Sequence, residues 1–204
     1  MTTSIFSSVS IGWVAITTGI TGLLGLAFIF LFFTIGQPFG TLNDICICLT
    51  AILSAILACF LFVEYHAQSP LLYQVAFILA LIGALIVTTG SLLVISGKTG
   101  WYLASLYMAT GNALVGLWLL GLNYSAQHSN SWPQSLGILG IVIGLIMTLG
   151  LVTIPGILNR IDAWGAAPWY VNYIGQAGSL GWFILYPIWC VLLGRSLLLN
   201  RLMM

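Results

Sequence analysis

The chain has three acidic residues and two histidines, and three of these five, Glu64, His66 and His128, have the chemistry of a metal site. Zinc binds histidine and carboxylate groups, and hydrolytic zinc sites keep a fourth position open for water. Glu64 and His66 follow the second long apolar segment and His128 follows the fourth, so all three fall on one side of a membrane. No H-E-x-x-H motif is present, and helix residues two apart diverge. A membrane-embedded, metal-dependent enzyme is one hypothesis. The other is a set of solvated interface residues in which Glu64 pairs with Arg195.

Asp44 has two possible roles. It follows Asn43 at the expected start of the second span, where a carboxylate meets the positive end of the helix dipole and unpaired N–H groups. This position predicts a capping charge that lies near Lys98 or Arg160, which fall on the same side of the membrane. The alternative is an ion or proton site, because an ionisable group close to the membrane interior is a candidate for function.

The polar residues expected inside the spans carry no charge. Ser105 and Asn112 are seven residues apart in the fourth apolar segment, so they share one face of a helix. Hydrogen bonds between helices, worth about 0.6 kcal/mol each on average, are one explanation for such residues. A polar cavity that holds a ligand is the other. The candidate residues of that cavity are Asp44, Asn112, Ser105, Glu64 and His66.

The composition shows which elements must position these residues. Charged residues make up 3% of the chain and hydrophobic residues 61%, whereas about 25% of a soluble domain is charged. Four basic and three acidic residues cannot cover the surface of 204 residues, so lipid must solvate most of it. The sequence predicts an all-α, polytopic transmembrane bundle that forms one integral membrane domain, residues 1–204. Its six expected spans are residues 11–35, 43–63, 71–96, 101–123, 134–158 and 175–199.

Three further features concern how these spans pack, bend and end. Gly137, Gly140 and Gly144 share a face of the fifth span and predict close approach of another helix, within the chain or in a dimer. Pro187 predicts a kink in the last span, because proline lacks the backbone N–H. Tryptophan and tyrosine are concentrated in residues 161–173, which predicts a short interfacial helix or a re-entrant loop there.

The membrane orientation is weakly encoded. Six spans place both termini on the same side of the membrane. Arg195 and Arg201 lie on that side, while Lys98 and Arg160 lie on the other, so the counts of basic residues are equal. We expect the protein in a bacterial inner membrane, with the termini in the cytoplasm.

Two stretches carry a family resemblance: FTIGQPFGTLNDI after the first span and SWPQSLGILGIVIG at the start of the fifth. They resemble an uncharacterised bacterial family of small polytopic membrane proteins. In that family a later helix opens with a leucine-proline-arginine-tryptophan type turn followed by L-G-x-x-G-I. The residues that fit this outline are Pro133, Leu136, Gly137, Gly140 and Ile141; those that depart from it are Trp132, Gln134 and Ser135. The family has no established activity, so the resemblance implies an architecture and a bacterial origin.

Three functions stay open at this point. The first is a non-enzymatic membrane protein. It would be an accessory subunit of a complex, a homo-oligomer, or a protein that binds a lipid-like molecule. The reason is that the ion paths of pumps need charged residues inside the membrane, and the expected spans contain none in their middle parts. The second is a small transporter or channel for a neutral or weakly polar solute, which would use Asn112 and the Pro187 kink. The third is the metal-dependent enzyme. We expect no cofactor, and one lysine and three arginines form no patch for nucleic acid.

Overall fold

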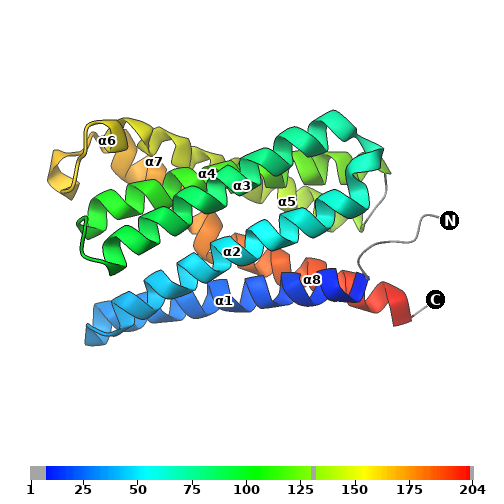
Figure 1. Cartoon of the computed structure of the whole chain (residues 1–204), viewed down its shortest axis with the longest axis horizontal. Helices are drawn as coiled ribbons and strands as arrows, with labels where there is room; N and C mark the ends of the chain where they lie inside the picture. Colours follow the sequence, from blue (N-terminus) through cyan, green and yellow to red (C-terminus); the bar gives the residue numbers. More distant parts are fainter. Residues whose placement is uncertain (1–7, 130–131, 203–204) are drawn as a thin grey trace.

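The computed structural model describes residues 8–129 and 132–202, and every regular element in these ranges is helical. Six helices are long and apolar enough to cross a membrane, so the predicted six-span, all-α bundle is confirmed (Figure 1). The first four spans are single helices: α1 (Ser8–Ile35), α2 (Phe39–Tyr65), α3 (Pro70–Ile95) and α4 (Trp101–Ser129). The start of α1 and the end of the last helix lie at the same end of the bundle (Figure 1).

The fifth and sixth spans are interrupted helices. The fifth consists of α5 (Gln134–Thr148), the 3₁₀ segment η2 (Leu149–Thr153) and α6 (Ile154–Leu158). The sixth consists of α7 (Trp169–Leu180), the π-helical segment η4 (Gly181–Leu185) and α8 (Tyr186–Leu202). Tyr186 N–H donates to Gly181 O, five residues back, in the turn that precedes Pro187. The helix irregularity expected at Pro187 therefore lies just before it.

Two short 3₁₀ segments, η1 (His66–Gln68) and η3 (Trp164–Ala166), complete the regular structure. The expected interfacial segment, residues 161–173, is divided between η3 and the first turn of α7, because Pro168 precedes a helix that begins at Trp169. The sixth span thus begins six residues before the expected position, 175.

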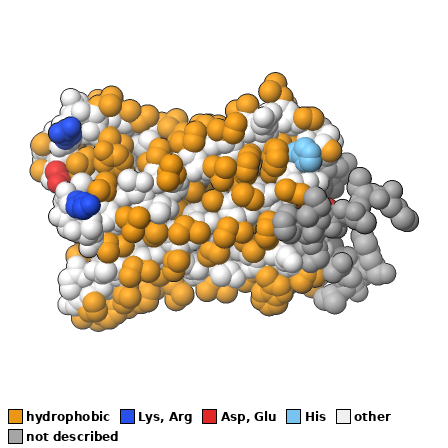
Figure 2. Space-filling view, in the orientation of Figure 1, with side chains coloured by type: hydrophobic (Ala, Val, Ile, Leu, Met, Phe, Trp, Pro, Cys, Tyr) orange, Lys and Arg blue, Asp and Glu red, His pale blue; other side chains and the backbone are white. Residues whose placement is uncertain are grey.

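The outer surface has the distribution of side chains found in integral membrane proteins. On the face shown in Figure 2, the charged side chains and the histidine lie at the two ends of the molecule, and the belt between them is hydrophobic or neutral. Large apolar side chains point outward along this belt, among them Phe30, Leu85, Leu145 and Ile188. A surface of this kind is stable where lipid tails replace water.

The interior is built on α4, the most buried of the six spans. Its neighbours α3 and α5 approach it at glycines. A Cβ atom added to Gly83 would lie 2.6 Å from Gly111 O, and one added to Gly144 would lie 2.7 Å from Gly116 O. The predicted tight packing on the glycine face of the fifth span is confirmed, since Gly137, Gly140 and Gly144 are all buried against α4.

The order of packing leaves room at one end of the bundle. α1 packs between α2 and α8, α3 packs between α2 and α4, and α5 and α7 cover the other side of α4. The end of α1 and the start of α2 therefore face the starts of α4 and α7. These two groups of helices are not in close contact there. The space between these two groups of helices is a cavity.

Candidate ligand-binding cavity

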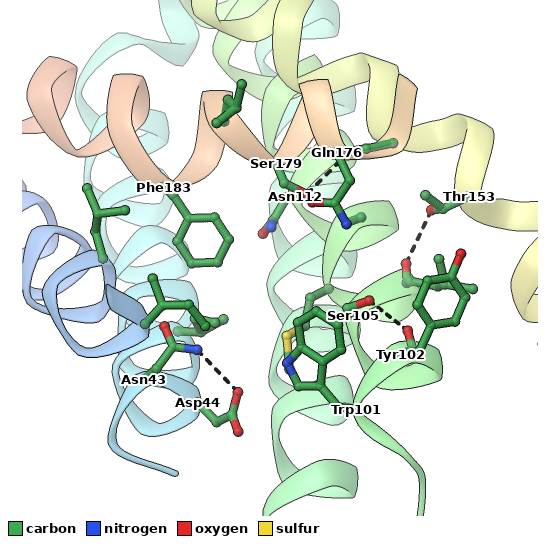
Figure 3. A pocket seen from close by; sticks show the side chains of 18 of the residues that line it. Asn43, Asp44, Trp101, Tyr102, Ser105, Asn112, Thr153, Gln176, Ser179 and Phe183 are labelled. Carbon is green, nitrogen blue, oxygen red and sulfur yellow. Dashed lines mark hydrogen bonds between the residues drawn. The ribbon is translucent and has the colours of Figure 1, made fainter. Parts of the chain in front are cut away.

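The cavity has a volume of about 330 Å³ and lies between α1 and α2 on one side and α4, α7 and η4 on the other (Figure 3). This volume is at the lower end of the roughly 300–1,000 Å³ found for small-molecule sites. Most of its lining is apolar, and the apolar residues include Leu26, Ile29, Phe30, Phe33, Ile47, Leu106, Met108, Leu180, Phe183 and Ile184. The polar residues stand on two opposite walls.

The first polar wall consists of Asn43 and Asp44 of α2. Asn43 is 2% exposed and Asp44 is 7% exposed. Asn43 Nδ2 donates to Asp44 Oδ1 at 3.5 Å, which is a long hydrogen bond. Reversing the Asn43 amide would bring two oxygens together, so this contact fixes its orientation. The oxygen of the same amide, Asn43 Oδ1, is buried and has no hydrogen-bond partner among the described residues.

The prediction that Asp44 caps the second helix is wrong. α2 begins at Phe39, directly after Pro38, so Asp44 is the sixth helical residue, and the helix dipole acts mainly within the first turn. Lys98 and Arg160 form no ion pair with Asp44 in the part of the chain that the structure describes. Asp44 therefore lines the cavity and does not cap α2.

The second polar wall comes from α4 and α7. It contains Ser105, Asn112, Gln176 and Ser179 (Figure 3). Ser105 Oγ donates to Tyr102 O at 2.7 Å, and Ser179 Oγ donates to Gly175 O at 3.3 Å, so both hydroxyl protons are used within their own helices. Asn112 is 4% exposed, and its Oδ1 has no partner among residues 8–129 and 132–202.

Unpaired buried acceptors are the most informative feature of this site. Leaving one buried acceptor without a donor costs about 1–3 kcal/mol. Among the described residues that line the cavity, Asn43 and Asn112 carry such an oxygen, Oδ1 in each case, and both atoms lie beneath the cavity surface. Native proteins satisfy nearly all of their buried polar groups, through protein groups or ordered water. A bound donor would reach either oxygen only after rotation of its amide side chain toward the cavity.

Side-chain hydrogen bonds hold the second wall in place. Tyr102 Oη donates to Asn172 Oδ1 at 2.5 Å, and Asn172 Nδ2 donates to Trp164 O at 3.0 Å, which joins α4, α7 and η3. Deeper in the bundle, Thr110 and Thr153 share a hydrogen bond of 2.8 Å between α4 and η2. These contacts fix the side of the cavity that carries Ser105 and Asn112.

The structure brings together three of the five residues expected to line a polar cavity: Asp44, Ser105 and Asn112. Glu64 and His66 are not among them, because they lie at the other end of α2 and are exposed. The sequence did not single out Asn43, Gln176 or Ser179. The position of Asn43 beside Asp44 was an available signal, whereas the α7 residues became identifiable only once that helix was placed.

The structure does not assemble the hypothetical metal site of Glu64, His66 and His128. Within the described ranges, no three histidine, cysteine, aspartate or glutamate side chains lie close enough to hold one metal ion. The Nδ1 atom of His66 lies 3.0 Å from Phe62 O, and that of His128 lies 2.8 Å from Tyr124 O. Each imidazole thus contacts a backbone carbonyl of its own helix.

Comparison of the chain with protein-family models, with curated proteins and with solved structures gave no match. The resemblance of the two sequence stretches to a bacterial membrane family stays a prediction. The functional argument therefore starts from the cavity.

Proposed function

We propose that this membrane protein binds an amphiphilic, lipid-like molecule in the cavity between α1–α2 and α4–α7, and that it does so without catalysis. The observation that carries the proposal is the composition of the cavity wall: apolar over most of its area, with the polar residues Asn43, Asp44 and Asn112 among those that line it. Ligand sites combine an apolar lining with a few convergent polar groups in this way.

The apolar part of the wall continues onto the lipid-facing surface. Phe30 and Phe33 of α1 line the cavity and are also 64% and 71% exposed. Leu180 of α7, on the opposite side of the cavity, likewise lines it and is exposed on the outer surface. A hydrocarbon chain can therefore pass from the bilayer into the cavity along apolar side chains, without crossing water.

The size of the cavity fits part of an amphiphile. The volume of about 330 Å³ is about ten times the roughly 30 Å³ that one water occupies in the liquid. It exceeds what a single ion needs and is too small for a whole phospholipid. The polar group and the first part of the chain would lie inside, and the rest of the chain would remain among the bilayer lipids.

The side chains of the site favour binding over catalysis. Nucleophilic catalysis needs a hydroxyl or thiol beside a base. Ser105 and Ser179 donate to backbone carbonyls of their own helices, and no described base accepts from either. Asp44 is the only lining residue, among those that the structure describes, with a formal charge.

Transport of the same amphiphile is the second candidate, and one observation favours it. Both interrupted spans have their irregular segments at the cavity: Thr153 belongs to η2, and Phe183 and Ile184 belong to η4. Interrupted helices mark the substrate sites of many transporters, because irregular backbone is tolerated where it lines a cavity.

The test is to identify what the purified protein carries. We expect native mass spectrometry and solvent extraction to find a stoichiometric amphiphile with the wild-type protein. Ser105→Phe places a ring in the cavity and should remove that molecule. Ser135→Phe, the same change at an exposed position at the other end of the bundle, should keep it. A wild-type sample without any bound amphiphile, or equal retention by the two variants, would contradict the proposal.

A further inference from the structure

We infer that the polar end of the bound amphiphile is a protonated primary or secondary amine, held by the Asp44 carboxylate at the cavity wall; this inference rests on the proposed function. The charge of the cavity gives the first reason. Asp44 is 7% exposed, no described lysine or arginine pairs with it, and its one hydrogen bond is the long contact with Asn43. A buried carboxylate is costly unless it is paired, and a bound ammonium group would pair it.

The hydrogen-bonding capacity of the cavity gives the second reason. Asp44 lines the cavity with a carboxylate that accepts, among the described residues, the long contact from Asn43 to Oδ1. The hydroxyl protons of Ser105 and Ser179 are already donated, so these groups have only lone pairs to offer. A protonated amine carries donors and no acceptor. It therefore matches what the buried walls lack.

The donors that line the cavity do not reverse this balance. The indole N–H of Trp101 and the amide of Gln176 belong to residues exposed at the rim. In the interior the amide donors are the N–H₂ group of Asn43, which already donates to Asp44, and that of Asn112. An anionic head group would meet the Asp44 carboxylate with no lysine, arginine or histidine in the described lining to hold it.

Aromatic rings add to the preference for a cation. Trp101 and Phe183 border the same cavity as Asp44, from α4 and η4 (Figure 3). Ring faces attract ammonium groups. A trimethylammonium group would gain this attraction but could not donate a hydrogen bond to the Asp44 carboxylate, whereas a primary amine gains both. The ligand class is thus an amphiphile with N–H donors on a positive head.

The experiment compares four probes with the same twelve-carbon chain on the detergent-purified protein: dodecylamine, dodecyltrimethylammonium, dodecanol and dodecanoate. Calorimetry should give dodecylamine an affinity about tenfold or more above that of the other three, a difference of about 1.4 kcal/mol in binding free energy. Asp44→Asn should remove that preference. Glu64→Gln, which removes an exposed acid at the other end of the same helix, should keep the preference and so controls for general attraction of cations to the protein.

The possible results separate the two proposals. If dodecanol or dodecanoate binds as tightly as dodecylamine, the amine assignment is wrong and the amphiphile site stands. If no probe binds, the proposed function itself fails. The comparison among probes on the wild-type protein needs no variant, so poor folding of Asp44→Asn would not leave the inference undecided.

The natural source of the amine is a separate arm of the experiment. Native mass spectrometry from nanodiscs of phosphatidylethanolamine, compared with nanodiscs of phosphatidylcholine, distinguishes a lipid head group from a free amine. Retention of phosphatidylethanolamine alone assigns the lipid. Dodecylamine binding without retention of either lipid assigns a free, single-chain amine. Preferential retention of phosphatidylcholine would overturn the requirement for N–H donors.

Discussion

Asp162 accepts a hydrogen bond from the backbone N–H of Gly100, with Gly100 N 2.8 Å from Asp162 Oδ2. Its second oxygen, Oδ1, accepts from Leu103 N–H at 2.9 Å. One carboxylate from the loop before α7 therefore satisfies two of the unpaired N–H groups at the start of α4, and its charge faces the positive end of that helix. This contact fixes the first turn of α4, which carries Trp101 and Tyr102 at the rim of the cavity.

The first prediction concerns this cap. Asp162→Ala should lower the free energy of unfolding by about 1 kcal/mol, within the range measured for N-caps. Asp162→Asn should lose less, because the amide oxygen can still accept one of the two hydrogen bonds. Thermal unfolding in detergent compares the three proteins. If the alanine variant is as stable as the wild type, the carboxylate does not stabilise the start of α4.

The second prediction concerns the unpaired oxygen of Asn112. Asn112→Leu keeps a similar volume and removes a buried acceptor that costs about 1–3 kcal/mol while it lacks a donor. The ligand-free variant should therefore unfold at a higher temperature than the ligand-free wild type, and it should retain less of the amphiphile. Stabilisation and loss of binding measured together would indicate a polar group kept for its ligand.

Asn123→Leu is the matched control for Asn112. Asn123 is a buried residue of the same helix, and its Oδ1 also lacks a partner among the described residues, but it does not line the cavity. Its replacement should leave amphiphile retention unchanged. Equal loss of the amphiphile in both variants would show a general effect on α4.

The third prediction concerns the contact between α4 and α5. Gly144→Leu should destabilise the protein by roughly 1–3 kcal/mol or more, since a side chain there would push into the backbone at Gly116. Gly165→Leu is the control, because a Cβ added to Gly165 meets nothing within 4 Å. A thermal-shift series that found both variants unchanged would mean that the two helices do not depend on this close approach.

The fourth prediction concerns a polar contact inside the bundle. Tyr186 Oη donates to Ser54 Oγ at 2.8 Å, joining α8 to α2 at a fully buried position. A double-mutant cycle of Tyr186→Phe and Ser54→Ala should give a coupling energy of about 0.6 kcal/mol, the average for side-chain hydrogen bonds in a membrane protein. Tyr173→Phe, at an exposed position, should be neutral. Additive effects of the two changes would show that the hydrogen bond contributes no stability.

The six spans could be predicted because their signal is simple: long runs without charge leave no alternative to a membrane helix. The start of α2 could not, since Gln37, Pro38 and Gly40 are typical of a turn. In the structure Pro38 immediately precedes the helix, and Gly40 allows the Phe32 ring to pack on its first turn, where an added Cβ would lie 2.9 Å from Phe32 Cδ2. Because the helix begins at Phe39, Asp44 lies beyond its first turn, in the lining of the cavity.

Only part of the candidate site could be predicted, because its residues come from several helices. Shared faces on one helix, such as that of Ser105 and Asn112, follow from the helix period. The approach of α2 to that face depends on how six helices pack, which no spacing within one helix encodes. Glu64 and His66 were grouped with the site because polar residues are rare in this chain, but the length of α2 separates them from it.

The burial of α4 has a consequence for how the protein enters its membrane. α4 is the most buried of the six spans and also the least apolar, with Thr110, Asn112 and Asn123 turned inward. A translocon inserts a helix according to its hydrophobicity as it leaves the ribosome, before the later spans exist. We therefore expect α4 to leave the translocon paired with α3, on which it closes at Gly83 and Gly111, and to reach its final depth only when α5 has been made.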